Sequence, residues 1–295
     1  MAKNFIFILT EGDHDSAFIY RILKANGMAA NHKTPIKSYP FPLGKLIENE
    51  VSSVPVKELN MENARSKFLP SYVMQREDEI ISIYRAGGDS KEKARVAFIE
   101  SINKFSITNQ DEIPVLEKGT RISILFFFDA DDKGVDKRID QVKEELKSSF
   151  PKSEANNIDK LANREILFIK SINVGSFVFA ESGKDIGLLE DILIPLMKQE
   201  NEDIFDAAEK FLSIHETTTL FRGKVEYDKT GTIKKKINEK KYAHKKSLIG
   251  TIGQLQMSGK SNTVCISDAD YLTDKKIKEN PICIDIYNFI QKALK

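Results

Sequence analysis

The fold is decided by the stretch ISILFFF, residues 122–128, which runs directly into DADD, residues 129–132. A second apolar stretch, FIFILT at residues 5–10, runs in the same way into EGDHD at residues 11–15. Each apolar run is typical of a buried strand in a parallel sheet. Ligands of open α/β sheets bind beyond the carboxyl ends of the strands. If the two strands are neighbours, several carboxylates share one crevice, and only a hard cation makes such a cluster favourable.

Length and composition narrow the class of protein. The 295 residues are 41% hydrophobic and 30% charged, enough for one large or two ordinary domains of a soluble protein. The longest apolar runs span about seven residues, against the roughly 20 that cross a bilayer. We therefore expect no membrane segment, and the first residues do not have the pattern of a secretory signal. Two cysteines supply neither a disulfide framework nor a zinc cluster, so a cytoplasmic location is expected.

Positive charge is concentrated in one segment, although the net charge of the whole chain is only +1. Residues 224–246 contain nine lysines and three acidic residues, an excess of six positive charges. Such a segment can follow a phosphate backbone. A solvated, lysine-rich loop or hairpin explains it equally well. The nine lysines are Lys224, Lys229, Lys234, Lys235, Lys236, Lys240, Lys241, Lys245 and Lys246.

Strands and helices alternate along most of the chain, which predicts a mainly parallel sheet with right-handed crossovers, flanked by helices. Further strands are expected at residues 79–84, 165–169 and 263–267. Residues 28–78 break the pattern with five prolines, and we interpret them as an insertion with a helix near 56–68. The expected helices cover residues 15–25, 91–104, 134–151, 187–193, 204–214, 246–256 and 284–294.

Glu11 and Asp15 are the candidate ligands after the first strand. They are four residues apart, so a helix that begins near Gly12 brings both carboxylates toward one cation. Gly12 also permits a tight turn and close approach of the backbone to a phosphate. The structural alternative for Asp15 is an acidic residue in the first turn of a helix, where the helix dipole favours negative charge. A structural role is harder to find for Glu11, at the end of an apolar strand.

Asp129 and Asp131 are the candidate ligands after the second strand. Alternating residues of an extended segment point the same way, so we expect both side chains to reach one ion. The structural alternative is an Asp-rich turn closed by Gly134.

Two other motifs have features of a functional site. Ser267-Asp268-Ala269-Asp270 follows the expected strand at 263–267, but no parallel unit follows it, and we interpret it as a surface turn. Gly259-Lys260-Ser261 has the ending of a P-loop, yet Gly253 is one residue too distant for that motif and a strand is expected where a helix should follow. We therefore expect no ATP-hydrolysing site.

The order of these pieces resembles the TOPRIM domain, the metal-binding catalytic fold shared by topoisomerases, bacterial primases and several nucleases. In that family a Glu ends the first strand and a DxD ends the third, which are the places of Glu11 and Asp129-Ala130-Asp131. The strand at 79–84 then lies between them. The chain is too short for a topoisomerase with its tyrosine-bearing domain, and two cysteines cannot supply the zinc module of a primase.

The finer details look most like the OLD (overcoming lysogenisation defect) nucleases. That branch has an acid four residues after the first Glu, a glycine-containing loop after the second strand, and an acid in a Leu-Glu motif after the fourth. Asp15, Gly87-Gly88 and Glu190 match these features. The branch also uses a lysine late in the domain, for which Lys246 is the match and Lys245 the rival.

The resemblance implies a division of the chain. A catalytic core would comprise residues 1–27 and 79–199, with 28–78 inserted and 200–295 forming an α/β C-terminal extension that packs on the core with its basic segment.

The resemblance also implies two-metal hydrolysis of DNA or RNA with Mg²⁺ or Mn²⁺. Glu11, Asp129 and Asp131 would hold one ion, Asp15 and Glu190 the other, and Lys246 would neutralise charge in the transition state. By family association, a separate ABC-type ATPase subunit and anti-phage defence are expected. The oligomeric state is left open, with a homo-oligomer as one alternative. The alternatives are a non-catalytic metal- or nucleotide-binding regulatory subunit, and phosphoryl transfer through an aspartyl intermediate, against which Asp132 counts.

Overall fold

The computed structural model describes residues 3–106, 116–215, 223–227, 229–231, 233–237 and 243–294. The chain divides into two compact units. The first unit combines Met1–Leu189 with Asp274–Lys295, and the second is Glu190–Thr273. The second unit is therefore inserted, in sequence, between two parts of the first.

Within the described residues, a sheet of seven strands forms the centre of the first unit, in the order β2-β3-β4-β1-β5-β7-β6. The strands β4, β1, β5 and β7 are parallel to their neighbours in this group, whereas β3 and β6 pair antiparallel at its two sides. The strands are β1 (Asn4–Thr10), β2 (Ala29–Ala30), β3 (Tyr72–Arg76), β4 (Glu79–Arg85), β5 (Arg121–Asp129), β6 (Ile166–Ile169) and β7 (Ile172–Phe179).

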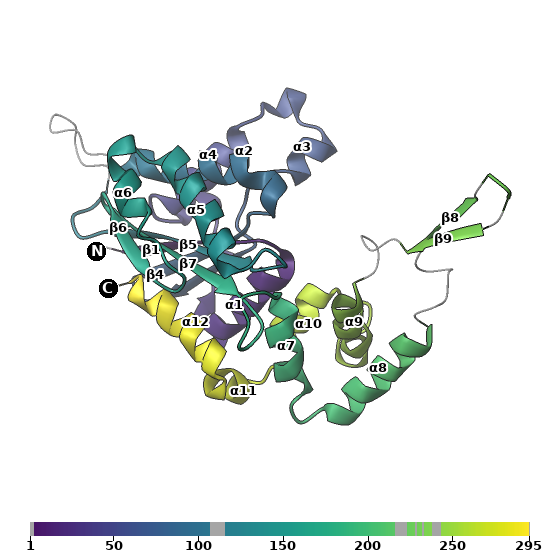
Figure 1. The fold of residues 1–295 in the computed structure, drawn as a ribbon. Helices are drawn as coiled ribbons and strands as arrows, with labels where there is room; N and C mark the ends of the chain where they lie inside the picture. Colours follow the sequence, from purple (N-terminus) through teal and green to yellow (C-terminus); the bar gives the residue numbers. More distant parts are fainter. Residues whose placement is uncertain are drawn as a thin grey trace. The chain divides into compact units, whose positions relative to one another are not determined.

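Helices cover both faces of this sheet, with α4 and α5 on one side and α1 and α12 on the other (Figure 1). Short 3₁₀ turns occur at Ile36–Ser38, Val56–Glu58, Asp89–Lys91 and Lys152–Glu154. The helices are α1 (Asp13–Ala25), α2 (Leu43–Ser52), α3 (Met61–Arg65), α4 (Glu92–Ser106), α5 (Val135–Ser149), α6 (Ala155–Ile158), α11 (Asp274–Glu279) and α12 (Pro281–Lys292).

The strand order creates a switch point between β1 and β5. From β1 the chain continues to β4 on one side, and from β4 it crosses over β1 to β5 on the other side. In the parallel register Thr10 lies opposite both Arg85 and Phe127, so the three strands end at the same edge. In doubly wound sheets the ligand crevice lies outside the strand ends at such a point. Glu11 follows β1, and Asp129 is the last residue of β5.

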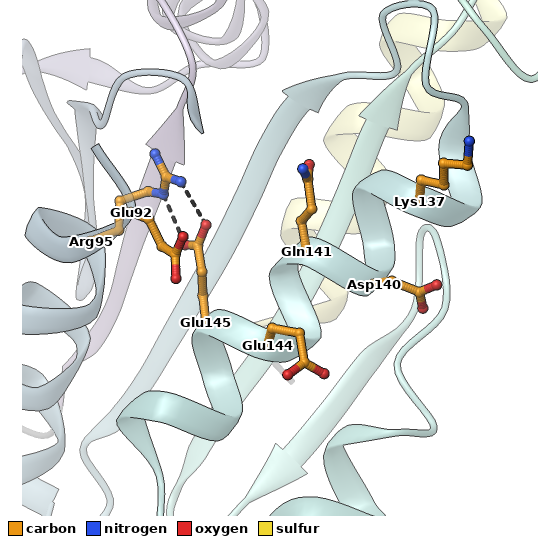
Figure 2. Close-up of a pocket in the computed structure, with 7 residues that line it drawn as sticks. All are labelled: Glu92, Arg95, Lys137, Asp140, Gln141, Glu144 and Glu145. Atoms are coloured by element: carbon orange, nitrogen blue, oxygen red, sulfur yellow. Dashed lines mark hydrogen bonds and ion pairs between the residues drawn. The ribbon is translucent and has the colours of Figure 1, made fainter. Parts of the chain in front are cut away.

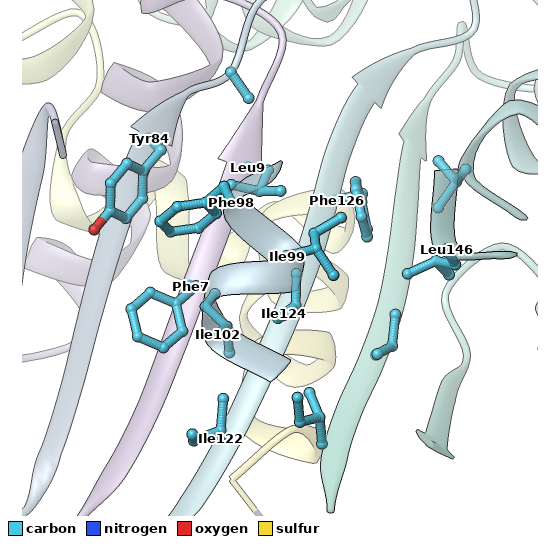
Figure 3. Packing of buried hydrophobic residues seen from close by; sticks show 14 of the residues in the cluster. Phe7, Leu9, Tyr84, Phe98, Ile99, Ile102, Ile122, Ile124, Phe126 and Leu146 are labelled. Carbon is cyan, nitrogen blue, oxygen red and sulfur yellow. The ribbon is translucent and has the colours of Figure 1, made fainter. Parts of the chain in front are cut away.

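The face toward α4 and α5 holds the main hydrophobic core. Alternate residues of β1 and β5, including Phe7, Leu9 and Phe126, pack there against Phe98 and Leu146 of the two helices (Figure 3). All five side chains are buried. Burial of each such side chain contributes about 2–3 kcal/mol.

The opposite face is closed by the end of the chain. Phe289 of α12 packs on Phe127 and Phe177, with ring centroids 5.7 and 5.8 Å away. Ser123 of β5 donates a hydrogen bond to the carbonyl of Ala293 at 2.7 Å. The first unit is thus completed by residues that lie beyond the second unit in sequence.

The second unit is mainly helical in the residues that the structure describes. Strands β8 and β9 pair antiparallel. Its elements are α7 (Leu189–Lys198, whose first residue belongs to the first unit), α8 (Glu202–His215), β8 (Gly223–Tyr227), β9 (Ile233–Ile237), α9 (His244–Gln256) and α10 (Asn262–Asp268).

The expected α/β architecture is confirmed, and the strands expected at 5–10, 79–84 and 122–128 are neighbours in the sheet. The predicted fourth strand was misplaced. Residues 166–169 form β6, an antiparallel strand at the side of the sheet, and the parallel neighbour of β5 is β7. β7 was not recognised because Asn173, Gly175 and Ser176 interrupt its apolar pattern.

Two further expectations were wrong. Residues 263–267 belong to helix α10, because burial of Cys265 and Ile266 on one side of a helix outweighs the strand preference of their β-branched neighbours. The helix expected over 56–68 is reduced to a 3₁₀ turn and the short α3. The segment 28–78 also adds β3 to the sheet, antiparallel to β4.

The boundaries of the two units differ from the division at residues 199 and 200 that the resemblance implied, because α11 and α12 return to the first unit. Among the helices that the structure describes, none combines the length and apolarity that crossing a membrane requires.

Candidate functional site

Glu11 and Asp131 meet on one guanidinium at the switch point. Nη2 of Arg138 donates to Oδ2 of Asp131 at 2.6 Å and lies 3.6 Å from Oε2 of Glu11. The three residues come from three places: the end of β1, the turn after β5, and the first turns of α5. Residues that are 120 positions apart in the sequence therefore contact the same nitrogen atom.

Arg138 is almost completely buried, with 4% of its side chain exposed, against 27% for Glu11 and 33% for Asp131. Its Nε donates to the carbonyl of Asp129 at 2.8 Å, and its guanidinium lies 5.8 Å from the centre of the Phe128 ring. A buried guanidinium is costly unless it is paired. Glu11 and Asp131 supply that pairing, and Arg138 in turn neutralises part of their charge.

Asp129 and Asp131 bind different partners, and the backbone is not extended at Asp131 as the expectation from strand alternation required. β5 ends at Asp129, and Asp131 has φ 51°, in the left-handed region that Asp tolerates better than most residues. Oδ1 of Asp129 accepts the N–H of Leu189 at 2.7 Å, while Asp131 turns toward Arg138. Asp131 also exchanges two backbone hydrogen bonds with Gly187. The extended geometry that we assumed for this motif is therefore wrong.

The loop after β4 closes the other side of Glu11. A Cβ atom on Gly88 would lie only 3.0 Å from Oε1 of Glu11, so glycine permits this close approach. Ala86 donates its N–H to the carbonyl of Thr10 at 2.8 Å, which joins the loop to the end of β1. The glycine-containing loop that the sequence indicated at Gly87 and Gly88 thus lies at the candidate site.

Asp15 takes the structural role that we considered for it. Its Oδ2 accepts the N–H of Gly12 at 2.6 Å, which caps the start of α1. The side chain is buried, with 4% of the residue exposed. This hydrogen bond and the favourable dipole of the helix N-terminus stabilise its carboxylate.

Glu190 and Lys246 lie in the second unit. Nζ of Lys246 is 4.0 Å from Oε1 of Glu190, whose side chain is only 3% exposed. The neighbouring Lys245 donates to Asp191 at 2.5 Å. The structure therefore places each of the two candidate lysines beside one of two consecutive acidic residues of α7.

The donor set at the switch point has the chemistry of a hard-cation site, since Mg²⁺ and Mn²⁺ prefer carboxylate oxygens. Among the described residues, no three or more His, Cys, Asp or Glu side chains lie close enough together to hold a metal ion. Arg138 lies where the carboxylates of Glu11 and Asp131 approach each other. A cation bound by these two carboxylates would compete with Arg138 for their oxygens.

The two competing motifs, at residues 267–270 and 259–261, are not among the residues of this site. Asp268 and Asp270 are exposed at the end of α10 and not after a strand. Lys260 precedes α10, so a helix does follow Gly259-Lys260-Ser261, and our expectation of a strand there was wrong. A P-loop remains excluded for two reasons. Gly253 is one residue too distant from Gly259 for the motif, and it is a buried residue inside α9.

Part of the basic segment forms the hairpin of β8 and β9, in which Lys224 pairs in register with Lys236 and Glu226 with Lys234. Lys240 and Lys241 lie outside the described residues.

Arg138 is the residue that we did not predict from the sequence. Helix α5 has charges at most positions, so an arginine in it is easily taken for a solvated one. The available signal was its spacing: Arg138 lies four residues before Val142 and eight before Leu146, on the apolar side of the helix.

Comparisons with known proteins show the family and the fold. No curated protein matches this sequence. A crystal structure of the hypothetical protein PH0156 from Pyrococcus horikoshii OT3 is similar, with a TM-score of 0.51 and 13% identity over 98% of this chain and 95% of that one. At this identity the likeness concerns the fold alone. Residues 6–293 match the family described as protein of unknown function DUF3226, and the chain therefore belongs to that family.

Proposed function

We propose that this protein is a metal-dependent nuclease of TOPRIM type, with its site at the switch point between β1 and β5. The observation that carries the proposal is the meeting of Glu11 and Asp131 on Arg138 beyond the carboxyl ends of two parallel strands. Three features support it: the position of the crevice, the hard oxygen donors, and a glycine loop that lets backbone approach Glu11.

In this proposal Glu11, Asp129 and Asp131 hold Mg²⁺ or Mn²⁺. A bound divalent cation supplies a water of lowered pKa and neutralises charge on the phosphate. Arg138 positions Glu11 and Asp131 relative to each other. DNA or RNA as the substrate, and a separate ATPase subunit as a partner, belong to the same proposal.

A second function is favoured by the pairings of Arg138 themselves. Because the guanidinium already neutralises part of the charge of Glu11 and Asp131, the cluster depends less on a bound cation. A regulatory subunit that binds a metal or a metal–nucleotide complex without turnover would use the same carboxylates. The two functions differ in one measurable property, which is phosphodiester cleavage.

The test uses the purified full chain with single- and double-stranded DNA and RNA, in the presence of Mg²⁺ or Mn²⁺ and in EDTA. We expect cleavage that EDTA abolishes. Glu11→Gln should reduce the rate by at least about 100-fold, as loss of a metal ligand does, with little change in the melting temperature.

Glu144→Gln is the matched control. Glu144 is exposed on α5 and pairs with Lys147, away from the switch point, so its substitution should leave cleavage unchanged. Cleavage that persists in Glu11→Gln would contradict the proposal. Mn²⁺ binding that Glu11→Gln abolishes, without cleavage of any substrate by the wild type, would favour the regulatory subunit.

A further inference from the structure

Arg95 of α4 holds the loop that follows β4. Its Nη1 donates to the carbonyl of Gly87 at 2.6 Å and to that of Gly88 at 2.8 Å, with the carbonyl of Ala86 at 3.4 Å. One guanidinium nitrogen thus contacts three consecutive backbone carbonyls. Arginine presents its donors in a rigid fork, so this contact fixes the direction in which the loop leaves the sheet.

A buried acid holds Arg95 in turn. Glu145 of α5 accepts from Nε at 2.8 Å and from Nη2 at 2.5 Å, and only 3% and 5% of the two side chains are exposed. Figure 2 shows Arg95 of α4 paired with Glu145 of α5. Both residues line a pocket of about 290 Å³ between the two helices. Because Glu145 uses Nε and Nη2, Nη1 remains for the loop.

The loop touches the candidate ligand Glu11 directly. Gly88 approaches Oε1 of Glu11 so closely that a Cβ atom would stand at 3.0 Å. The loop is also tied to β1 immediately before Glu11, through the hydrogen bond from Ala86 to Thr10 at 2.8 Å. A displacement of the loop therefore changes the space in which the Glu11 carboxylate lies.

Arg95 and Arg138 share one aromatic ring. Their guanidinium carbons lie 5.2 and 5.8 Å from the centre of Phe128, within the range of cation–π contacts. Arg138 contacts Oε2 of Glu11, and Arg95 holds the loop that lies against Oε1. The two oxygens of Glu11 are thus positioned from two sides by residues that pack on the same side chain.

We infer that Arg95 is a positioning residue for Glu11 and acts through the Ala86-Gly87-Gly88 loop. This inference rests on the proposed function for the role of Glu11 in metal binding. The structural alternative is that Arg95 and Glu145 only join α4 to α5. In that case substitutions would lower stability without any specific effect at Glu11.

The key variant is the double substitution Arg95→Met/Glu145→Met. Replacing both members of a buried ion pair by apolar residues of similar size avoids leaving one charge unpaired, so the fold is retained. The contacts to the loop carbonyls are lost. Asn103→Ala is the matched control, because Asn103 is buried on α4 and donates a hydrogen bond to the Ser149 carbonyl at the end of α5.

The first measurement is amide hydrogen exchange, which requires no metal. Ala86 donates to Thr10 and Lys91 to Gly88, so the two amides report the order of the loop. We expect both to exchange about tenfold faster in the double variant and at the wild-type rate in Asn103→Ala. Unchanged exchange in the double variant would overturn the inference.

The second measurement is the affinity for Mn²⁺, which should fall about tenfold in the double variant, as it does when residues that orient metal ligands are removed. In the Glu11→Gln background the same double substitution should cause no further loss, because its effect acts through Glu11. An equal loss in both backgrounds, or none in either, would overturn the inference.

The two proposals fail in different ways. If the wild type does not bind Mn²⁺, the proposed function is wrong, and the exchange of Ala86 and Lys91 alone decides whether Arg95 anchors the loop. If the wild type binds Mn²⁺ and cleaves, but the double variant does so equally well, only the role of Arg95 is wrong.

Discussion

The tripeptide Asp-Ala-Asp occurs twice in this chain, at 129–131 and at 268–270, and the two copies have different surroundings. The first follows the buried strand β5, and Asp131 pairs with the buried Arg138. The second follows the short helix α10, where Asp268 accepts from the hydroxyl of Ser267 at 2.8 Å and both aspartates are exposed.

The tripeptide does not make a site by itself. An Asp in water needs no partner, whereas an Asp beyond a parallel strand shares its space with the ends of neighbouring strands. At 129–131 that neighbour is Glu11, and a buried guanidinium holds the two acids together. The proposed site therefore depends on the sheet and on Arg138 as much as on the motif.

The largest expected effect separates the two copies by activity. Asp131→Asn should reduce metal-dependent cleavage by about 100-fold, because it removes a proposed ligand and weakens the pairing with Arg138. Asp270→Asn should leave cleavage unchanged. Rates with Mg²⁺ measured for both variants test this, and equal loss in the two variants would remove the distinction between the copies.

The next effect concerns stability. Arg138→Met breaks a buried pairing and should cost about 2–3 kcal/mol, less than a fully buried pair because Asp131 is a third exposed. Arg164→Met breaks the exposed pair with Asp285 and should cost less than about 1 kcal/mol. Urea unfolding of both variants measures the difference, and similar costs would show that Arg138 is not an important anchor.

A smaller effect is expected from two glycines that have similar space around them. Gly88→Ala places a Cβ 3.0 Å from Oε1 of Glu11, and Gly250→Ala places one 3.0 Å from Oδ1 of Asn262 in the second unit. Since the Glu11 side chain can turn away, we expect Gly88→Ala to reduce cleavage about tenfold at nearly unchanged stability. Gly250→Ala should not alter the rate. Cleavage and thermal melting of both variants provide the test.

The last effect is a pH dependence beside the second copy. Burial raises the pKa of the Cys265 thiol from 9.0 to about 11. The unfolded chain therefore loses this proton at lower pH than the folded one, so the thiol's contribution to stability is complete below pH 9 and is lost as the pH rises toward 11. The difference in unfolding free energy between wild type and Cys265→Ala should shrink over that interval, by up to about 2–3 kcal/mol. A constant difference would contradict the assignment.

The centre of the fold could be predicted from the sequence because its strands are long and almost wholly apolar. Residues 5–10 and 122–128 cannot form anything but buried elements, and their neighbours in the sheet follow from the alternation with helices. β7 was not predicted because polar and small residues interrupt its apolar pattern. One of them, Gly175, packs against Ile166 and Phe289, and these contacts exist only in the folded protein.

The candidate site was predicted in part. Glu11 and Asp131 were identified from their positions after the strands, and the structure brings them to one cation of the chain itself. That cation was missed, because the sequence argument considered only a metal as the partner of clustered acids. The backbone conformation of Asp131 was also not predicted. A single residue with φ 51° ends the extended geometry that strand alternation requires.

The position of the second unit within the chain has a consequence for synthesis on the ribosome. α12 covers one face of the sheet, and Ser123 and Phe127 of β5 contact it through Ala293 and Phe289. A nascent chain that has emerged only to Leu189 lacks this cover and exposes an apolar face of its central strand. The first unit therefore finishes folding only after the whole second unit has been translated, and nascent chains stalled before residue 274 should depend on chaperones to avoid aggregation.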